Sequence, residues 1–155
     1  MSAKACTLFK PLPSSTLLIV CIIQRKENPS DFPILKSVVS ALIPFRNSVW
    51  DILSTGTGNL WLGTTENGIN RFTPVKGSQR YRIDSYTSVQ GLPGNQILCL
   101  FEDKESNIWI GTNGDGLCML PGDHFAHYTT KSGLPNNKVQ HIEQDAAGNY
   151  WLASD

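Results

Sequence analysis

The 155-residue sequence has little of what marks most enzymes and nucleic-acid-binding proteins. Its 13 basic residues are balanced by 13 acidic ones, so no excess of positive charge favours nucleic acid as a partner. It has only three histidines, and no glycine-rich phosphate loop is present. The sequence therefore predicts no nucleic-acid binding and no cofactor, and it contains no kinase core or receiver pattern.

Cysteine is also scarce, and its spacing argues against a metal site. The four cysteines are Cys6, Cys21, Cys99 and Cys118. No two of them form a Cys-x-x-Cys pair, and no histidine lies at a zinc-like distance from them. We expect small buried apolar side chains at these positions and predict no metal site. A disulfide stays open if the chain is exported, but nothing specifies a pairing.

Long hydrophobic runs are missing as well. The most apolar stretch, residues 16–23, is far shorter than the roughly 20 residues that a helix needs to cross a bilayer, so no membrane span is predicted. Prolines and the lack of a small-residue cleavage site favour a strand or an irregular segment here over an export signal. Residues 1–46 carry a net charge of +4 and no tryptophan, so we expect a non-repeat N-terminal segment.

What the sequence does contain is an internal repeat. Three segments align without gaps and begin at Asn47, Asn95 and Asn137. In each, an apolar stretch and a turn lead to a second asparagine twelve positions on. A tryptophan follows two positions later at Trp61, Trp109 and Trp151. A small residue comes two positions after it, at Gly63, Gly111 and Ala153.

Each unit is expected to form short antiparallel strands. In the first unit the strands are predicted at residues 49–53, 60–64, 69–72 and 82–86. In the second, the third and fourth strands are predicted at residues 117–120 and 124–128. Asn67-Gly68 and Asp115-Gly116 supply the hairpin turns between the second and third strands of the two units. Four strands in a period of roughly 40–45 residues are typical of a propeller blade, and we expect the tryptophans to pack between blades.

The full motif is Gly-Leu-Pro-x-Asn, a strand, and then Asp-x-x-Gly-Asn-x-Trp-x-Gly-Thr. It resembles the two-component regulator propeller repeat over residues 47–155, although Ser106 replaces the usual glycine of the second unit. The resemblance implies an all-β fold of four-stranded antiparallel blades in an incomplete propeller of about two and a half blades. After the segment of residues 1–46, the blades are expected at about residues 47–90, 91–132 and, truncated, 133–155.

The resemblance also implies a function. The chain is expected to be a fragment of the sensory propeller region of a two-component system regulator or sensor kinase, periplasmic or extracytoplasmic in its parent protein. Such regions sense ligands, often carbohydrate-derived ones, or contact other blades and proteins. No catalysis is expected in this chain, and the sequence assigns no residue to ligand binding.

Two other functions stay open. Streptogramin lyases are similar in fold and use histidine and glutamate near the propeller axis; His141 and Glu143 are the matching candidates here. An unchanged turnover in a His141→Ala variant would exclude this reading. An interaction scaffold without a small ligand is the other alternative. We expect His124 and His127 to have surface or structural roles.

The small number of repeats predicts poor solubility. Propellers close with about four to eight blades, so two and a half leave sheet edges and faces uncovered. We expect the purified chain to self-associate in size-exclusion chromatography with light scattering. A monodisperse monomer that unfolds cooperatively would contradict this expectation.

Overall fold

The computed structural model describes residues 49–78, 80–121 and 124–154. The expected non-repeat segment, residues 1–46, lies outside the described residues, together with Cys6 and Cys21. The described ranges contain ten β-strands and two short 3-10 turns. Within them, no helix is long and apolar enough to cross a membrane.

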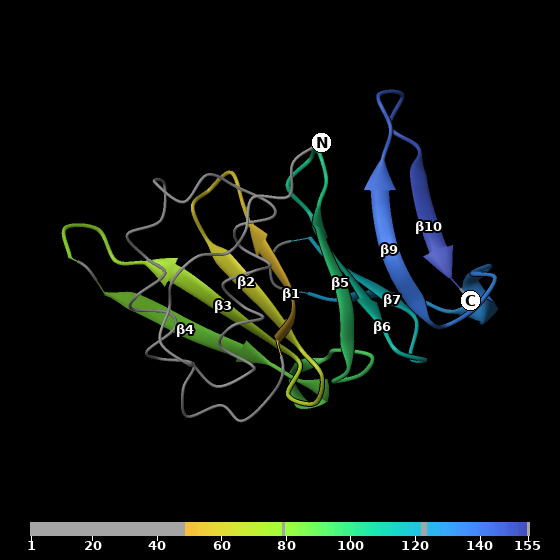
Figure 1. Ribbon diagram of the computed structural model, residues 1–155, viewed down its shortest axis with the longest axis horizontal. Helices are drawn as coiled ribbons and strands as arrows, with labels where there is room; N and C mark the ends of the chain where they lie inside the picture. The colour runs from red at the N-terminus through yellow and green to blue at the C-terminus, as the bar shows by residue number, and fades with distance from the viewer. Residues whose placement is uncertain (1–48, 79, 122–123, 155) are drawn as a thin grey trace, which may run out of the picture. The chain divides into compact units, whose positions relative to one another are not determined.

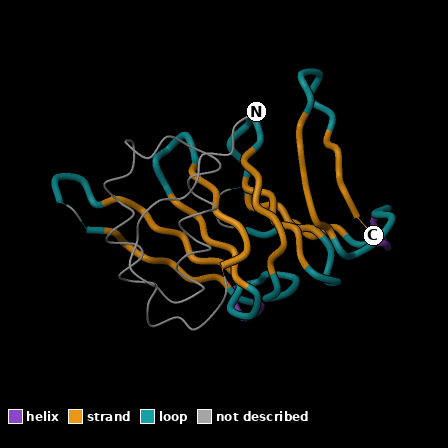
Figure 2. The backbone as a smooth tube through the Cα atoms, in the orientation of Figure 1, coloured by secondary structure: helices purple, strands orange, loops and turns teal. Residues whose placement is uncertain are grey.

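The strands form three antiparallel sheets, which we call blades 1, 2 and 3 (Figures 1 and 2). Blade 1 has the order β1 (Val49–Ser54), β2 (Leu60–Thr64), β3 (Ile69–Pro74) and β4 (Tyr81–Tyr86). Blade 2 has the order β5 (Ile97–Glu102), β6 (Ile108–Thr112), β7 (Leu117–Leu120) and β8 (Ala126–Tyr128). Blade 3 pairs β9 (Val139–Gln144) with β10 (Tyr150–Ser154).

These sheets confirm the predicted fold class. The expected strands are present with ends that differ by one or two residues, because the outermost ladder bonds decide where a strand stops. The predicted hairpin turns are confirmed too. Gly68 and Gly116 have φ angles of 66° and 95°, a left-handed conformation that glycine adopts without steric cost.

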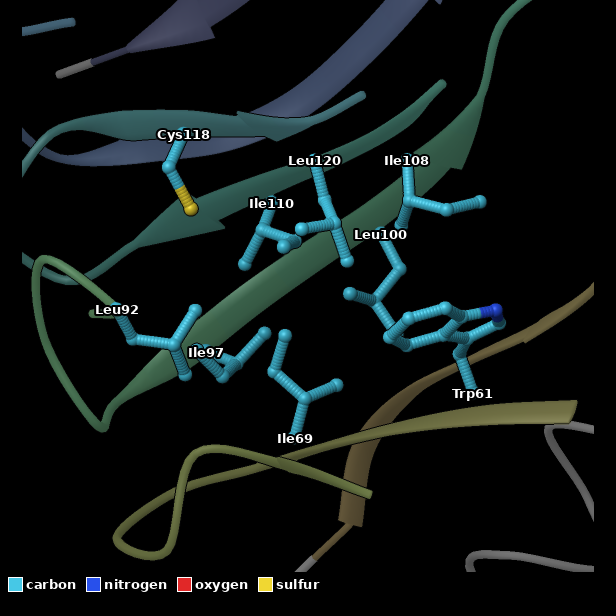
Figure 3. Close-up of a cluster of buried hydrophobic side chains, with 9 residues drawn as sticks. All are labelled: Trp61, Ile69, Leu92, Ile97, Leu100, Ile108, Ile110, Cys118 and Leu120. Carbon is cyan, nitrogen blue, oxygen red and sulfur yellow. The ribbon is translucent and has the colours of Figure 1, made fainter. Parts of the chain in front are cut away.

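Blade 2 is apolar on both faces because it is covered on both. On one face, Ile108 and Ile110 of β6 join Trp61 and Ile69 of blade 1 in a shared hydrophobic core (Figure 3). On its other face, Trp109 lies in a second core with Val139 and Ile142 of blade 3, and all five residues of β6 are buried. Each such side chain contributes about 1.5–3 kcal/mol when fully buried.

The Gly-Leu-Pro linker closes each core from one end. Before it, Thr87 and Thr129 accept hydrogen bonds at the start of the 3-10 turns η2 (Ser88–Gln90) and η3 (Thr130–Ser132). The linker glycine then ends the turn with a positive φ, and the leucine enters the core; Leu92 is 3% exposed. The motif therefore has a structural explanation, as a plug for the space between two blades.

The glycine that follows each tryptophan lets neighbouring blades approach. A Cβ placed on Gly63 would lie 2.6 Å from Ile97 Cγ2 of blade 2. A Cβ on Gly111 would lie 2.6 Å from the carbonyl oxygen of Val139 in blade 3. Neither distance is tolerated by a real side chain, so both positions exclude every residue larger than glycine. Ala153 occupies the equivalent position on blade 3; we call a set of equivalent positions in the aligned repeats a column.

The expectation that the repeated tryptophans pack between blades is wrong for one of them, Trp151. Trp61 and Trp109 are buried, but Trp151 is 65% exposed, because no described residue covers that face of blade 3. Trp50 is 53% exposed for another reason, which is a local irregularity of β1. Burial of the repeated tryptophan thus depends on the blade that follows it.

We expect Gly111→Ala to destabilise the protein by about 1–3 kcal/mol, since the added methyl group overpacks the contact with blade 3. The measurement is the urea unfolding free energy. Gly56→Ala is the matched control, because a Cβ there meets nothing within 4 Å. Equal stabilities of the two variants would show that the blades do not pack this closely.

Candidate functional site

A β-bulge lies at the same place on the first strand of every blade. In blades 1 and 2, the register shifts between Val49 and Asp51 and between Ile97 and Cys99, so the inserted residues are Trp50 and Leu98. In blade 3 the equivalent inserted residue is Gln140. A bulge re-aims the side chain that it inserts, so these three side chains leave the faces that pack between blades.

The inserted residues line an open cleft of about 460 Å³, which we call the bulge cleft. Its walls are Trp50, Leu98, Asn113, Lys138 and Gln140. The half-exposed indole of Trp50 and the Leu98 side chain supply apolar surface, and the other walls supply amide and ammonium groups. The Asn113 amide nitrogen donates a hydrogen bond of 2.9 Å to Gln96. An aromatic face beside fixed polar groups is the usual composition of a small-molecule site.

The sequence did not point to this cleft. Its column holds Trp50, Leu98 and Gln140, three unlike residues, whereas the repeat was recognised by columns of like residues. The unlike residues in an otherwise regular repeat were the available signal. A column that varies within a repeated strand is one that packing between blades does not constrain.

The structure brings His141 and Glu143 together but places them away from the bulge cleft. His141 Nε2 lies 3.4 Å from Glu143 Oε1, and the two side chains are 64% and 72% exposed. The residues equivalent to His141 in blades 1 and 2 are Asp51 and Cys99. Those equivalent to Glu143 are Leu53 and Phe101, and these side chains face the following blade. The pair therefore stands on the open face of blade 3, in contact with solvent.

The columns show what that face does in the other blades. The Leu100 main-chain nitrogen of blade 2 donates a 2.8 Å hydrogen bond to the Asp51 carboxylate of blade 1. The Cys99 thiol of blade 2 donates a 3.6 Å hydrogen bond to the Val139 carbonyl of blade 3. The residues equivalent to His141 in blades 1 and 2 thus form hydrogen bonds to the next sheet, so His141 occupies a position that serves packing between blades.

The remaining candidates have structural surroundings. His127 Nε2 lies 2.8 Å from the carbonyl oxygen of Gly91, and His124 is exposed just before β8. Cys99 and Cys118 are buried, as expected of small apolar residues. Burial raises the pKa of Cys118 to about 12, so it is not a thiolate nucleophile at neutral pH. Among the described residues, no group of histidines, cysteines or carboxylates could hold a metal ion.

The aspartate of the repeat motif is a structural centre. Asp103 Oδ2 accepts hydrogen bonds from Asn107 Nδ2 at 2.9 Å, from Trp109 Nε1 at 2.7 Å and from Tyr150 OH at 2.8 Å. Asp103 Oδ1 accepts a further one from the Asn107 main-chain nitrogen at 2.8 Å. Tyr150 belongs to blade 3, so one carboxylate joins its own turn, its own tryptophan and the next blade.

These bonds change the acidity of the groups involved. Burial alone would raise the pKa of Asp103, but the hydrogen bonds from Asn107, Trp109 and Tyr150 outweigh it and hold that pKa below its ordinary value. On blade 3, hydrogen bonds from Asn149 and Trp151 lower the pKa of Asp145 to about 2. Burial and the Asp103 charge raise the pKa of the Tyr150 hydroxyl to about 12. Asp103 is therefore an acceptor fixed in its ionised form.

Four-stranded antiparallel sheets that stack face to face and are joined through plugged turns are blades of a β-propeller. Residues 91–114 and 133–155 match the two-component regulator propeller family. The two matching segments are those that carry the sequence motif most fully. No curated protein matches the chain at a significant level.

Solved structures with the same fold come from B. thetaiotaomicron. The extracellular domain assigned to the hybrid two-component system BT3049 has 22% identity and a TM-score of 0.59 over 70% of this chain. The one assigned to hybrid system BT4673 has 25% identity and a TM-score of 0.59 over 75% of this chain. The chain spans only 14% and 16% of those two domains.

We expect Asp103→Asn to cost about 1–3 kcal/mol of unfolding free energy at neutral pH, because a buried charge-assisted acceptor is lost. Since the folded pKa of Asp103 is depressed, its contribution is complete above the ordinary value of 3.8 and is lost as pH falls below it. The wild type should therefore lose stability in acid more steeply than the variant. Urea unfolding as a function of pH measures both effects.

Asp145→Asn is the control for this experiment. Asp145 makes the same bonds to its own turn and tryptophan, but it is only partly buried and, within the described residues, has no partner from a following blade. Its substitution should cost less than that of Asp103. Equal costs for the two variants would contradict the role of the Tyr150 bond between blades.

Proposed function

We propose that this chain is part of the sensory propeller region of an extracytoplasmic receptor of two-component type. We further propose that its bulge cleft takes part in recognising a carbohydrate-derived ligand. The observation that carries the second proposal is the indole of Trp50, 53% exposed beside amide groups in the bulge cleft. The C–H face of a sugar stacks on such a ring, and amides bond its hydroxyl groups.

The extracytoplasmic location is supported by the comparisons. The similar structures are extracellular domains assigned to bacterial signalling systems, and two segments of this chain match the propeller repeat of two-component regulators. The ligand class is supported by the family resemblance and by the composition of the cleft. The output module of the parent protein would lie outside these 155 residues.

We propose no catalysis by this chain. The candidate pair of a lyase, His141 and Glu143, lies on a column that packs against a neighbouring blade in the rest of the molecule. It is also exposed, so the groups would act in water without a pocket that orients a substrate. An interaction scaffold is the function left if no small ligand binds.

Binding should depend on Trp50. Against a panel of oligosaccharides, we expect at least one to shift the tryptophan fluorescence and the melting temperature of the chain. In Trp50→Ala the dissociation constant should rise about tenfold or more, since an anchoring aromatic face is removed.

Trp151→Ala is the matched control, because Trp151 is also more than half exposed but lies outside the bulge cleft. It should leave the affinity unchanged. An equal loss in both variants would place the ligand elsewhere, and the absence of any response across the panel would favour the scaffold.

A further inference from the structure

A second cleft lies between blades 1 and 2, beside the turn that joins β1 to β2. It has a volume of about 160 Å³, and we call it the turn cleft. Its walls include Thr55, Asn59, Trp61, Arg71 and Glu102. It lies at the place in blade 1 that corresponds to the Asp103 carboxylate of blade 2, so the two blades can be compared atom by atom.

In blade 1, Thr55 replaces the aspartate and makes only some of the hydrogen bonds that Asp103 makes in blade 2. Thr55 Oγ1 accepts a hydrogen bond of 3.2 Å from the Asn59 main-chain nitrogen, as Asp103 Oδ1 does from Asn107. Threonine has no second oxygen, and Thr57 Oγ1 accepts from Asn59 Nδ2 at 3.1 Å where Asp103 Oδ2 accepts from Asn107 Nδ2. No hydrogen bond joins either hydroxyl to Trp61 Nε1. Blade 1 therefore lacks the acceptor that binds the tryptophan in blade 2.

The donor that this acceptor would serve is still present. Trp61 occupies the Trp109 column, and within the described part of the chain its Nε1 has no hydrogen-bond partner. No fully buried side-chain nitrogen of the described residues lacks a partner, so this N–H retains access to solvent at the cleft. Figure 3 shows the indole nitrogen at the edge of the cluster, on the side away from Leu92 and Cys118.

Blade 1 also has a positively charged residue, Arg71, near the position where the aspartate is missing. Arg71 stands across from Trp61 where blade 2 has Met119 across from Trp109. Its guanidinium carbon lies 5.4 Å from the centre of the Trp61 ring, and two of its nitrogens donate to Asp84 at 3.2 and 2.9 Å. Guanidinium has five N–H groups, so donors remain for another anion.

We propose that the turn cleft binds the carboxylate group of a ligand, one oxygen of which accepts from Trp61 Nε1 as Asp103 Oδ2 accepts from Trp109 Nε1 in blade 2. Trp61 Nε1 and the Arg71 guanidinium are its donors. The volume of about 160 Å³ admits a carboxylate with a few attached atoms, and the open side lets a larger ligand extend into solvent. This site is separate from the bulge cleft and does not depend on the carbohydrate proposal.

One wall of the cleft opposes the anion and thereby supplies a test. Glu102 accepts a 3.0 Å hydrogen bond from the Gly56 nitrogen, and Gln144 accepts the equivalent bond from Lys104 at 3.0 Å. Blade 3 shows that glutamine makes this contact equally well. Glu102→Gln should therefore keep the contact between blades, remove a negative charge from the cleft and strengthen carboxylate binding.

The experiment uses sodium acetate as the probe on the full 155-residue chain, at low protein concentration and neutral pH. The urea midpoint, followed by tryptophan fluorescence, is compared with that in sodium chloride of equal ionic strength and in neutral acetamide. We expect acetate alone to raise the midpoint, with a dependence on concentration that saturates as for one site. A general salt effect of acetate would rise without saturation and would be the same in every variant.

Thr55→Asp decides the question, because it restores within blade 1 the carboxylate that blade 2 has. We expect this variant to be more stable in chloride and to lose the specific response to acetate, while Glu102→Gln should enlarge that response. Trp61→Phe, which keeps most of the packing but removes the N–H donor, should lose the response as well and serves if Thr55→Asp does not fold. An acetate response of wild-type size in Thr55→Asp or in Trp61→Phe would overturn the proposal, as would its absence in the wild type.

Discussion

Burial of one sheet by the next is the contact on which the rest of this structure depends. A four-stranded sheet that is apolar on both faces cannot be stable in water by itself, since each face exposes a row of aliphatic and aromatic side chains. Blade 2 shows the complete arrangement, with a core on either side and every residue of β6 buried. Gly63 and Gly111 set the closeness of the contact, because a single added carbon would collide with the neighbouring blade.

Polar contacts fix the register of this stacking. The carboxylate of Asp103 receives donors from its own turn and from Tyr150 of the next blade, and Asp51 receives the Leu100 nitrogen. Hydrophobic burial has no direction, whereas these bonds do, so they determine how one sheet lies on another. The asparagine, aspartate and tryptophan of the motif thus stabilise the architecture.

Differences between the repeats are where specific chemistry becomes available. The bulge column carries Trp50, Leu98 and Gln140, and the turn column carries Thr55, Asp103 and Asp145. The bulge column lies outside the packing between blades. At the turn column Asp103 bonds the next blade through Tyr150, whereas Thr55 of blade 1 makes no such bond. Trp50 in the bulge cleft and Thr55 in the turn cleft each occupy such a varying position.

Much of the fold was predictable from the spacing of tryptophan, glycine and asparagine. The strand and turn positions follow from local chemistry, in that Gly68 and Gly116 permit positive φ and apolar residues flank them. Whether each tryptophan is buried was not predictable from this local chemistry. Trp109 and Trp151 have the same local motif, yet one is 8% and the other 65% exposed, because burial depends on a sheet that is distant in sequence.

The sequence by itself determined the repeat, the strand order within each blade and the family of the motif, since all three rest on contacts between residues near in the chain. Only the tertiary structure decided which faces are covered and where polar groups meet. It placed His141 and Glu143 on a packing face, Trp50 in a cleft, and Arg71 beside a tryptophan that lacks its carboxylate. These outcomes depend on bulges and on contacts between blades, which join residues about 40 to 50 positions apart and leave no local pattern in the chain.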